Sequence, residues 1–143
     1  MVFVQKITRT ELARSTRRVL DNVQRGRAAL IEKHGQPEAA ILDILDYYIL
    51  QGIVQYHARS KEINPKKGLN TEAVEDCEGN EEVYILVMLH YLARAISLSR
   101  AAELLEVPAL ELRARFQRLG IPIRTEPKDN EAVLSDVEAL ASL

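Results

Sequence analysis

One amphipathic helix, predicted between Thr10 and Gly26, constrains the fold of this chain more than any other segment. With residues placed 100° apart around the axis, Leu12, Val19 and Val23 fall within about 40° of one another, and Leu20 lies about 80° from Leu12 on the same apolar side. Arginines occupy the opposite side: Arg14, Arg17, Arg18 and Arg25. The apolar stripe needs burial, so the arginines must face solvent or an anionic partner.

The ends of this helix carry their own signals. Thr10 is predicted to be the N-cap, and Gly26 is predicted to end the helix. Ser15 and Thr16 are poor helix formers, so two short helices separated at that point are an alternative.

Few carboxylates accompany the arginines. Glu11 and Asp21 lie near the helix ends, so i,i+4 ion pairs do not account for this face. It is either an ordinary solvated face or a surface for a polyanion. Residues 1–36 carry eight Lys/Arg against three Asp/Glu, whereas residues 37–96 carry five against ten. This asymmetry favours binding of a polyanion at the N-terminal end.

Short apolar runs on both sides of the helix predict strands. Residues 2–7 form the first, and residues 28–33 and 38–42 form two more around a turn containing Gly35 and Pro37. The last two runs predict a β-hairpin. A three-stranded sheet of this size needs a helix or a second subunit to cover it.

These segments together resemble the N-terminal domain of the Phd/YefM antitoxin family. The similarity rests on TELAR at 10–14, VLDNV at 19–23, Gly26 to Ile31, HGQPEA at 34–39, and Tyr47 or Tyr48. Ala13 and Thr16 depart from the family, which commonly has Arg and Leu there. The resemblance implies a homodimer that binds operator DNA through its basic half. The candidate DNA-binding residues here are Arg9, Thr10, Arg14, Arg17 and Arg18.

The middle of the chain divides into a helix and a linker. Residues 43–60 are helical in pattern, with Gly52 as a mild interruption. This helix is apolar around much of its circumference, and burial against a second subunit would explain that. Residues 61–81 have few large apolar side chains and are predicted to be a mobile linker. The predicted domains are therefore 1–60 and 82–143.

The C-terminal third predicts a helix–turn–helix. Helices are expected over 82–96 and 100–106, with a turn at Val107–Pro108 and a third helix ending at Gly120. Small residues at 101 and 102 allow close helix approach, and the shared core is Leu105, Val107, Leu112 and Phe116. Arg113, Gln117 and Arg118 project away from that core and can read base edges or bind phosphates. A helical hairpin that packs only against protein is the alternative.

Residues 97–140 resemble a family of short, uncharacterised bacterial and archaeal proteins. The shared features are AAEL at 101–104, Phe116, GIP at 120–122 and an acidic end at 136–140. Residues 91–96 depart from the usual Y-x-x-G-K. The resemblance implies an antitoxin of a PIN-domain ribonuclease. The candidate toxin-binding residues are Val133, Leu134, Val137 and Leu140, in a tail that fits either a groove on a partner or its own domain.

The remaining features argue against other classes of protein. No run of eighteen apolar residues predicts a membrane helix, and no leader peptide is recognisable. The single Cys77 favours a cytoplasmic protein. The three histidines, His34, His57 and His90, have no metal-ligand spacing. No metal, cofactor or enzymatic activity is expected, because no catalytic constellation is present.

The sequence thus predicts an α+β fold, with a small three-stranded sheet followed by an all-helical helix–turn–helix domain. Together the two resemblances imply a homodimeric antitoxin of a type II toxin–antitoxin system, which binds a PIN-domain ribonuclease and represses its own operon at operator DNA. The alternatives are a stand-alone transcriptional regulator and an adaptor whose helix–turn–helix contacts only protein.

Overall fold

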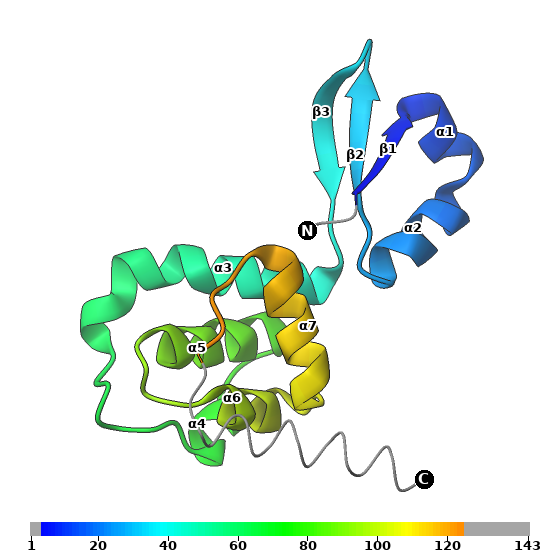
Figure 1. Ribbon diagram of the computed structural model, residues 1–143. Coiled ribbons are helices and arrows are strands. Elements are labelled where there is room, and N and C mark those ends of the chain that lie inside the picture. Colours follow the sequence, from blue (N-terminus) through cyan, green and yellow to red (C-terminus); the bar gives the residue numbers. More distant parts are fainter. Residues whose placement is uncertain (1–3, 125–143) are drawn as a thin grey trace, which may run out of the picture. The chain divides into compact units, whose positions relative to one another are not determined.

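The computed structural model describes residues 4–124 of the chain. Its two compact units divide between Tyr47 and Tyr48, inside helix α3 (Ile44–Arg59) (Figure 1). We call the residues before this division unit 1 and those after it unit 2. The helical pattern up to Ser60 predicts a later boundary, at residue 60. The described fold is α+β, as predicted, with one three-stranded sheet and several helices.

Unit 1 contains a mixed sheet in the order β1-β2-β3. Strand β1 (Val4–Thr8) pairs in parallel with β2 (Ala28–Lys33), and β2 pairs antiparallel with β3 (Gln36–Ile41). A parallel pair needs a crossover connection, which the helical segment between β1 and β2 supplies. The predicted three-stranded sheet is confirmed.

A two-residue turn joins β2 to β3, so the predicted hairpin is also confirmed. Its residues, His34 and Gly35, have φ angles of 53° and 77°. Two consecutive positive φ angles are typical of a type I′ turn, whose twist matches that of the flanking strands. Pro37 lies in β3 rather than in the predicted turn, and β3 is an edge strand, where a residue without an N–H is tolerated.

The helical segment is broken at Ser15, as the alternative interpretation of the sequence predicts. Helix α1 (Arg9–Arg14) precedes the break and α2 (Thr16–Gln24) follows it. The hydroxyl of Thr16 donates to the carbonyl oxygen of Leu12 at 2.7 Å. Such side-chain bonds to the backbone compete with regular helix geometry and promote a bend.

Thr8 caps α1, so the predicted cap at Thr10 was wrong. The Thr8 Oγ1 accepts a hydrogen bond from the Glu11 backbone N–H at 3.1 Å, and Thr10 lies inside the helix. Thr8 is the last residue of β1, where it pairs with Glu32 of β2, and α1 begins directly after it. At the other end, Gly26 has a φ of 98° and follows the last turn of α2, as predicted.

The apolar stripe of α2 covers one face of the sheet. Val19 and Val23 are buried together with three sheet residues, Ile7, Ala29 and Ile31. Leu20, at the edge of the predicted stripe, is 41% exposed instead. Figure 1 shows both short helices on the same side of the strands. Burial of this stripe orients the rest of α2, because the opposite side of the helix must then face away from the sheet.

Unit 2 is helical. Besides its part of α3 it contains the 3-10 turn η1 (Ser60–Glu62), α4 (Thr71–Glu75), α5 (Asn80–Leu92), α6 (Leu98–Leu105) and α7 (Ala109–Leu119). Residues 106–108 join α6 to α7, in agreement with the predicted helix–turn–helix. Ala101, Leu112 and Phe116 are fully buried, and Gly120 ends α7 with a φ of 74°.

Helix α5 ends at Leu92 rather than at the predicted Ile96. The N–H of Arg94 donates to the Tyr91 carbonyl oxygen at 3.0 Å, and the N–H of Ala95 donates to that of His90 at 2.9 Å. Arg94 has a φ of 64°, so the chain leaves the helix at this residue. The apolar pattern continues past the helix end, which is why periodicity alone overextends it.

The segment predicted as a linker is part of unit 2 and packs against its other residues. Leu69 is only 7% exposed, and its carbonyl oxygen accepts a hydrogen bond from Arg100 Nη2 at 3.1 Å. Helix α4 lies in the same segment, and the Asn70 side chain caps it by accepting from Ala73 N–H at 2.9 Å. The low apolar content of this segment predicted a mobile linker, but a buried leucine and a hydrogen bond from Arg100 attach it to the rest of unit 2.

Part of the apolar surface of α3 is buried within the chain. Ile49 is fully buried, and the rings of Tyr48 and Tyr84 lie 5.9 Å apart. Packing against α5 accounts for this side of the helix without a second subunit. Val54 remains 62% exposed, so the helix keeps an uncovered apolar position within unit 2.

Candidate nucleic-acid interface

Four arginines line one hollow at the break between α1 and α2. The hollow has a volume of about 420 Å³ and is lined by Arg14, Ser15, Thr16, Arg17, Arg18, Asp21, Asn22 and Arg25. We call it the arginine hollow. The structure therefore brings together three of the predicted DNA-binding residues, Arg14, Arg17 and Arg18, and adds Arg25. Arg25 already falls on the arginine side of the predicted helix. Its position was therefore sufficient to predict it as a DNA-binding residue.

The break at Ser15 and the buried stripe together build the hollow. Val19 and Val23 hold one side of α2 against the sheet, so Arg17, Arg18 and Arg25 emerge on the exposed side. Because the helix direction changes at Ser15, Arg14 from the end of α1 lines the same hollow. An uninterrupted helix would keep all four arginines on one straight convex face instead.

The charge of the arginine hollow is not neutralised within the described residues. Among residues 4–124, none forms a hydrogen bond or ion pair with the guanidinium of Arg14, Arg17, Arg18 or Arg25. Asp21 is the one acidic residue among the described ones that lines the hollow, so a single carboxylate accompanies four guanidinium groups. Four exposed guanidinium groups around one concave surface can bind phosphate oxygens, for which the planar fork of arginine donors is well suited.

Arg9 and Thr10 do not line this hollow. The Arg9 guanidinium pairs with the Glu38 carboxylate in β3, with Nη2 2.9 Å from Oε2. The hydrogen bond and the charge of Glu38 raise the pKa of Arg9, and the hydrogen bond from Arg9 lowers the pKa of Glu38. The predicted DNA contact of Arg9 thus competes with an internal partner that the sequence did not reveal. Thr10 is exposed on α1.

The helix–turn–helix presents a more mixed surface. Gln117 is exposed on α7, whereas Arg113 and Arg118 are half-buried. On the same helix, Arg115 Nη2 pairs with Glu111 Oε1 at 3.1 Å. A carboxylate beside the candidate reading residues reduces the positive potential that attracts DNA. The structure does not gather these residues into a basic hollow comparable to that of unit 1.

The candidate toxin-binding residues lie outside the described residues. Val133, Leu134, Val137 and Leu140 all belong to the segment after Arg124, so the structure does not test them.

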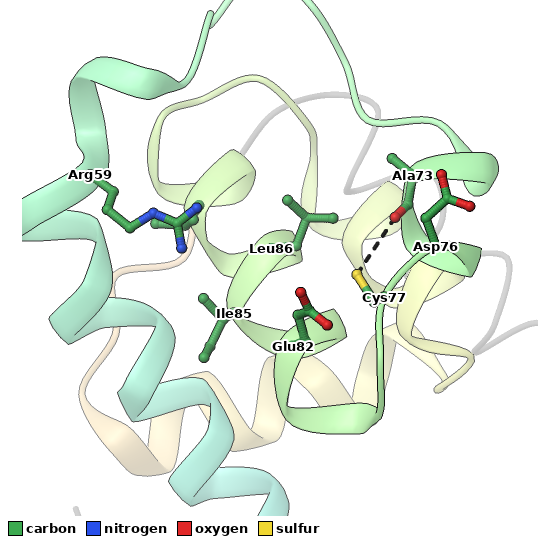
Figure 2. Close-up of a pocket in the computed structure, with 8 residues that line it drawn as sticks. Arg59, Ala73, Asp76, Cys77, Glu82, Ile85 and Leu86 are labelled. Carbon is green, nitrogen blue, oxygen red and sulfur yellow. Dashed lines mark hydrogen bonds between the residues drawn. The ribbon is translucent and has the colours of Figure 1, made fainter.

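A second hollow in unit 2 has a different chemistry. Its volume is about 250 Å³, and it is lined by Arg59, Ala73, Asp76, Cys77, Glu82, Ile85, Leu86 and Leu89. Figure 2 shows Arg59 on one side of it and Cys77 with Ala73 on the other. Burial raises the pKa of the Cys77 thiol, and the charges of Glu82 and Asp76 raise it further. The reactive thiolate form of Cys77 is therefore disfavoured. No histidine among the described residues lines the hollow.

Two structural findings bear on the other expectations. Within residues 4–124, no group of three or more His, Cys, Asp and Glu side chains is placed to hold a metal ion. No helix in this described part of the chain has the length and apolar character needed to cross a membrane.

Neither protein-family models nor curated proteins nor solved structures include a match to this chain.

Proposed function

We propose that this protein is the antitoxin of a type II toxin–antitoxin system and represses its own operon by binding operator DNA. The observation that carries the DNA-binding part is the arginine hollow, in which four guanidinium groups lack partners among residues 4–124. The antitoxin part rests on the two sequence resemblances, to the Phd/YefM family and to the family linked to PIN-domain ribonucleases.

The hollow is suited to the backbone of DNA rather than to its base edges. The four arginines lie on short helices above the sheet, and phosphate oxygens are the anionic groups that DNA presents in a regular array. Each neutralised phosphate releases bound counterions, so affinity must fall as salt concentration rises. Sequence specificity would require additional contacts that these arginines do not supply.

The open face of the sheet supports the proposal of a homodimer. Leu30 of β2 and Ala40 of β3 are paired neighbours on the face opposite the helices, and Ala40 is exposed. Leu42, Ile44 and Tyr47, at the end of unit 1, are 36%, 55% and 42% exposed. Apolar surface of this extent at one end of a small unit supports burial against a second copy. Two copies would carry two arginine hollows to a palindromic operator.

The DNA-binding part is tested with a duplex from the region upstream of the gene. Affinity is measured by fluorescence anisotropy at several salt concentrations for the full chain and for the Arg14→Ala/Arg17→Ala variant. We expect weaker binding and a salt slope reduced by about two, one for each lost phosphate contact. Arg27→Ala is the matched control, because Arg27 is exposed in unit 1 but does not line the hollow. An unchanged slope in the double variant would contradict the assignment.

The toxin part is tested with the neighbouring gene. An adjacent short reading frame that encodes the spaced acidic residues of a PIN nuclease is co-expressed with the full chain and with a chain ending at Arg124. We expect the product to co-purify with the full chain and not with the shortened one, while both bind the duplex equally. Failure of the full chain to bind the nuclease would favour the stand-alone regulator, which the arginine hollow supports equally well.

A further inference from the structure

Unit 2 contains a second basic cavity, separate from the arginine hollow. Its volume is about 370 Å³, and it is lined by Gly68, Leu69, Arg94, Ala95, Ile96, Ser97 and Arg100. We call it the Arg94 cavity. It lies where residues 68–69 meet the connection between α5 and α6. Its two charged lining residues are both arginines, and no carboxylate lines it.

The two arginines of the Arg94 cavity have different roles. Arg100 is held in place, because Nη2 donates to the Leu69 carbonyl oxygen at 3.1 Å and Nη1 pairs with Glu103 Oε1 at 2.9 Å. Arg94 is exposed, and no residue within 4–124 pairs with its guanidinium. In the cavity, the Arg100 guanidinium is held by Leu69 and Glu103. The Arg94 guanidinium is available to a ligand.

The walls of the cavity are ordered by contacts on both sides. Leu69 is 7% exposed and Ile96 is 6% exposed, so the main chain on each side is anchored by a buried side chain. The Ser97 hydroxyl accepts from the Arg100 backbone N–H at 3.1 Å. A preformed concave wall lowers the ordering cost of binding a small anionic group.

We propose that the Arg94 cavity binds a phosphate group of a nucleic-acid backbone. Arginine is suited to phosphate because its planar fork of donors matches the oxygen geometry. The cavity lies at the beginning of α6, the first helix of the helix–turn–helix. In proteins of that architecture, the first helix crosses the phosphate backbone while the second faces the groove. Unit 2 would then hold nucleic acid by its own contact, independent of the arginine hollow in unit 1.

The conformation of Arg94 provides a variant that separates binding from folding. Its φ of 64° is one that glycine adopts without strain. Arg94→Gly therefore removes the guanidinium while relieving the backbone. We expect its thermal midpoint to be at least that of the parent protein. Glu106→Gly is the matched control, because Glu106 also follows a helix of unit 2 with a positive φ, 58°, and does not line the cavity.

The experiment measures binding of a short DNA duplex to the full chain at several salt concentrations. We expect Arg94→Gly to weaken affinity severalfold and to reduce the salt slope by about one. Glu106→Gly should retain the parent slope. An Arg94→Gly protein that is folded and has the parent slope and affinity would overturn the proposal.

Free phosphate is distinguished from nucleic acid in a second measurement. Amide NMR shifts of residues 95–97 are followed while inorganic phosphate or the duplex is added. Shifts caused by the duplex, and lost in Arg94→Gly, support the backbone contact. Shifts caused by inorganic phosphate alone, with duplex affinity unchanged in Arg94→Gly, would assign the cavity to a small anion and overturn the proposal.

The outcome is also separable from that of the proposed function. If Arg94→Gly weakens duplex binding and Arg14→Ala/Arg17→Ala does not, the inference about unit 2 stands and the arginine hollow is the wrong interface. The reverse result retains the arginine hollow and overturns the inference about unit 2.

Discussion

Gly52 of α3 and Met88 of α5 are in direct contact, and the contact leaves no room for a side chain at residue 52. A Cβ atom built on Gly52 would lie 2.5 Å from Met88 Cβ and 2.9 Å from Met88 Cγ. Both residues are buried. The glycine that interrupts the helical pattern of residues 43–60 is therefore a point of close approach between two helices of unit 2, and the sequence alone predicts only a weakened helix there.

Gly52→Ala is expected to destabilise the protein. Alanine gains about 1 kcal/mol of helix propensity over glycine, but the overlap with Met88 must displace a helix, at a cost of about 1–3 kcal/mol. Urea unfolding of Gly52→Ala, Met88→Gly and the double variant measures the coupling between the two positions, because glycine at residue 88 removes both atoms that the new methyl group would meet. The double variant should be less unstable than the sum of the two changes. A stabilised Gly52→Ala protein would show that α3 and α5 are not in contact here.

The Arg9–Glu38 pair predicts an acid-sensitive contribution to stability. Arg9 lowers the pKa of Glu38 in the folded protein. A carboxylate with a lowered folded pKa stabilises the fold above its unfolded pKa, and that stabilisation is lost as pH falls through the folded pKa. We expect the free energy of unfolding to decrease below about pH 4.3, the ordinary pKa of Glu, and Glu38→Gln to lose part of this dependence. Chemical unfolding between neutral and acidic pH measures both curves.

Arg9→Ala should weaken DNA binding less than Arg17→Ala. The Arg9 guanidinium must leave Glu38 to contact a phosphate, whereas Arg17 lines the hollow without a partner among residues 4–124. Anisotropy titrations of the two single variants on the same duplex give the comparison. Equal losses of affinity would mean that the ion pair opens when DNA binds.

The helix ends of unit 2 predict opposite effects for two substitutions. Gly120 has a φ of 74° at the end of α7, and no atom lies within 4 Å of the position that a Cβ would take, so Gly120→Ala is strained only by its backbone. We expect it to destabilise by about 1 kcal/mol. Glu106 has a φ of 58° at the end of α6, so Glu106→Gly should stabilise by less than about 1 kcal/mol. Thermal unfolding followed by circular dichroism tests both signs.

Cys77 should react slowly with alkylating reagents at neutral pH. Burial and the neighbouring carboxylates raise the pKa of its thiol, and only the thiolate is strongly nucleophilic. The rate of iodoacetamide labelling, followed by mass spectrometry, should increase with pH up to values above the ordinary thiol pKa. The same protein unfolded in urea is the control and should react faster at about pH 8, near the ordinary thiol pKa. Equal rates in the folded and unfolded protein would contradict the buried environment.

Several elements of the fold could be predicted because they depend on neighbouring residues alone. Two short apolar runs on either side of Gly35 predict the hairpin, since such runs around a turn residue pair as neighbouring strands. Val19 and Val23 define the buried side of α2 by their spacing, and the same spacing places the arginines on the other side. The sequence could not show whether Thr8 or Thr10 caps α1. That depends on where β1 ends, and Thr8 is its last residue, paired with Glu32 in the sheet.

Residue type and spacing alone determined the mixed α/β composition of unit 1, its hairpin and the face on which its arginines lie, because those properties follow from backbone preferences and helical geometry. Tertiary structure decided which arginines line a common hollow, that Arg9 pairs with Glu38, and that the residues around Leu69 pack against Arg100. These features depend on contacts between residues far apart in the chain, and local sequence patterns carry no record of such contacts.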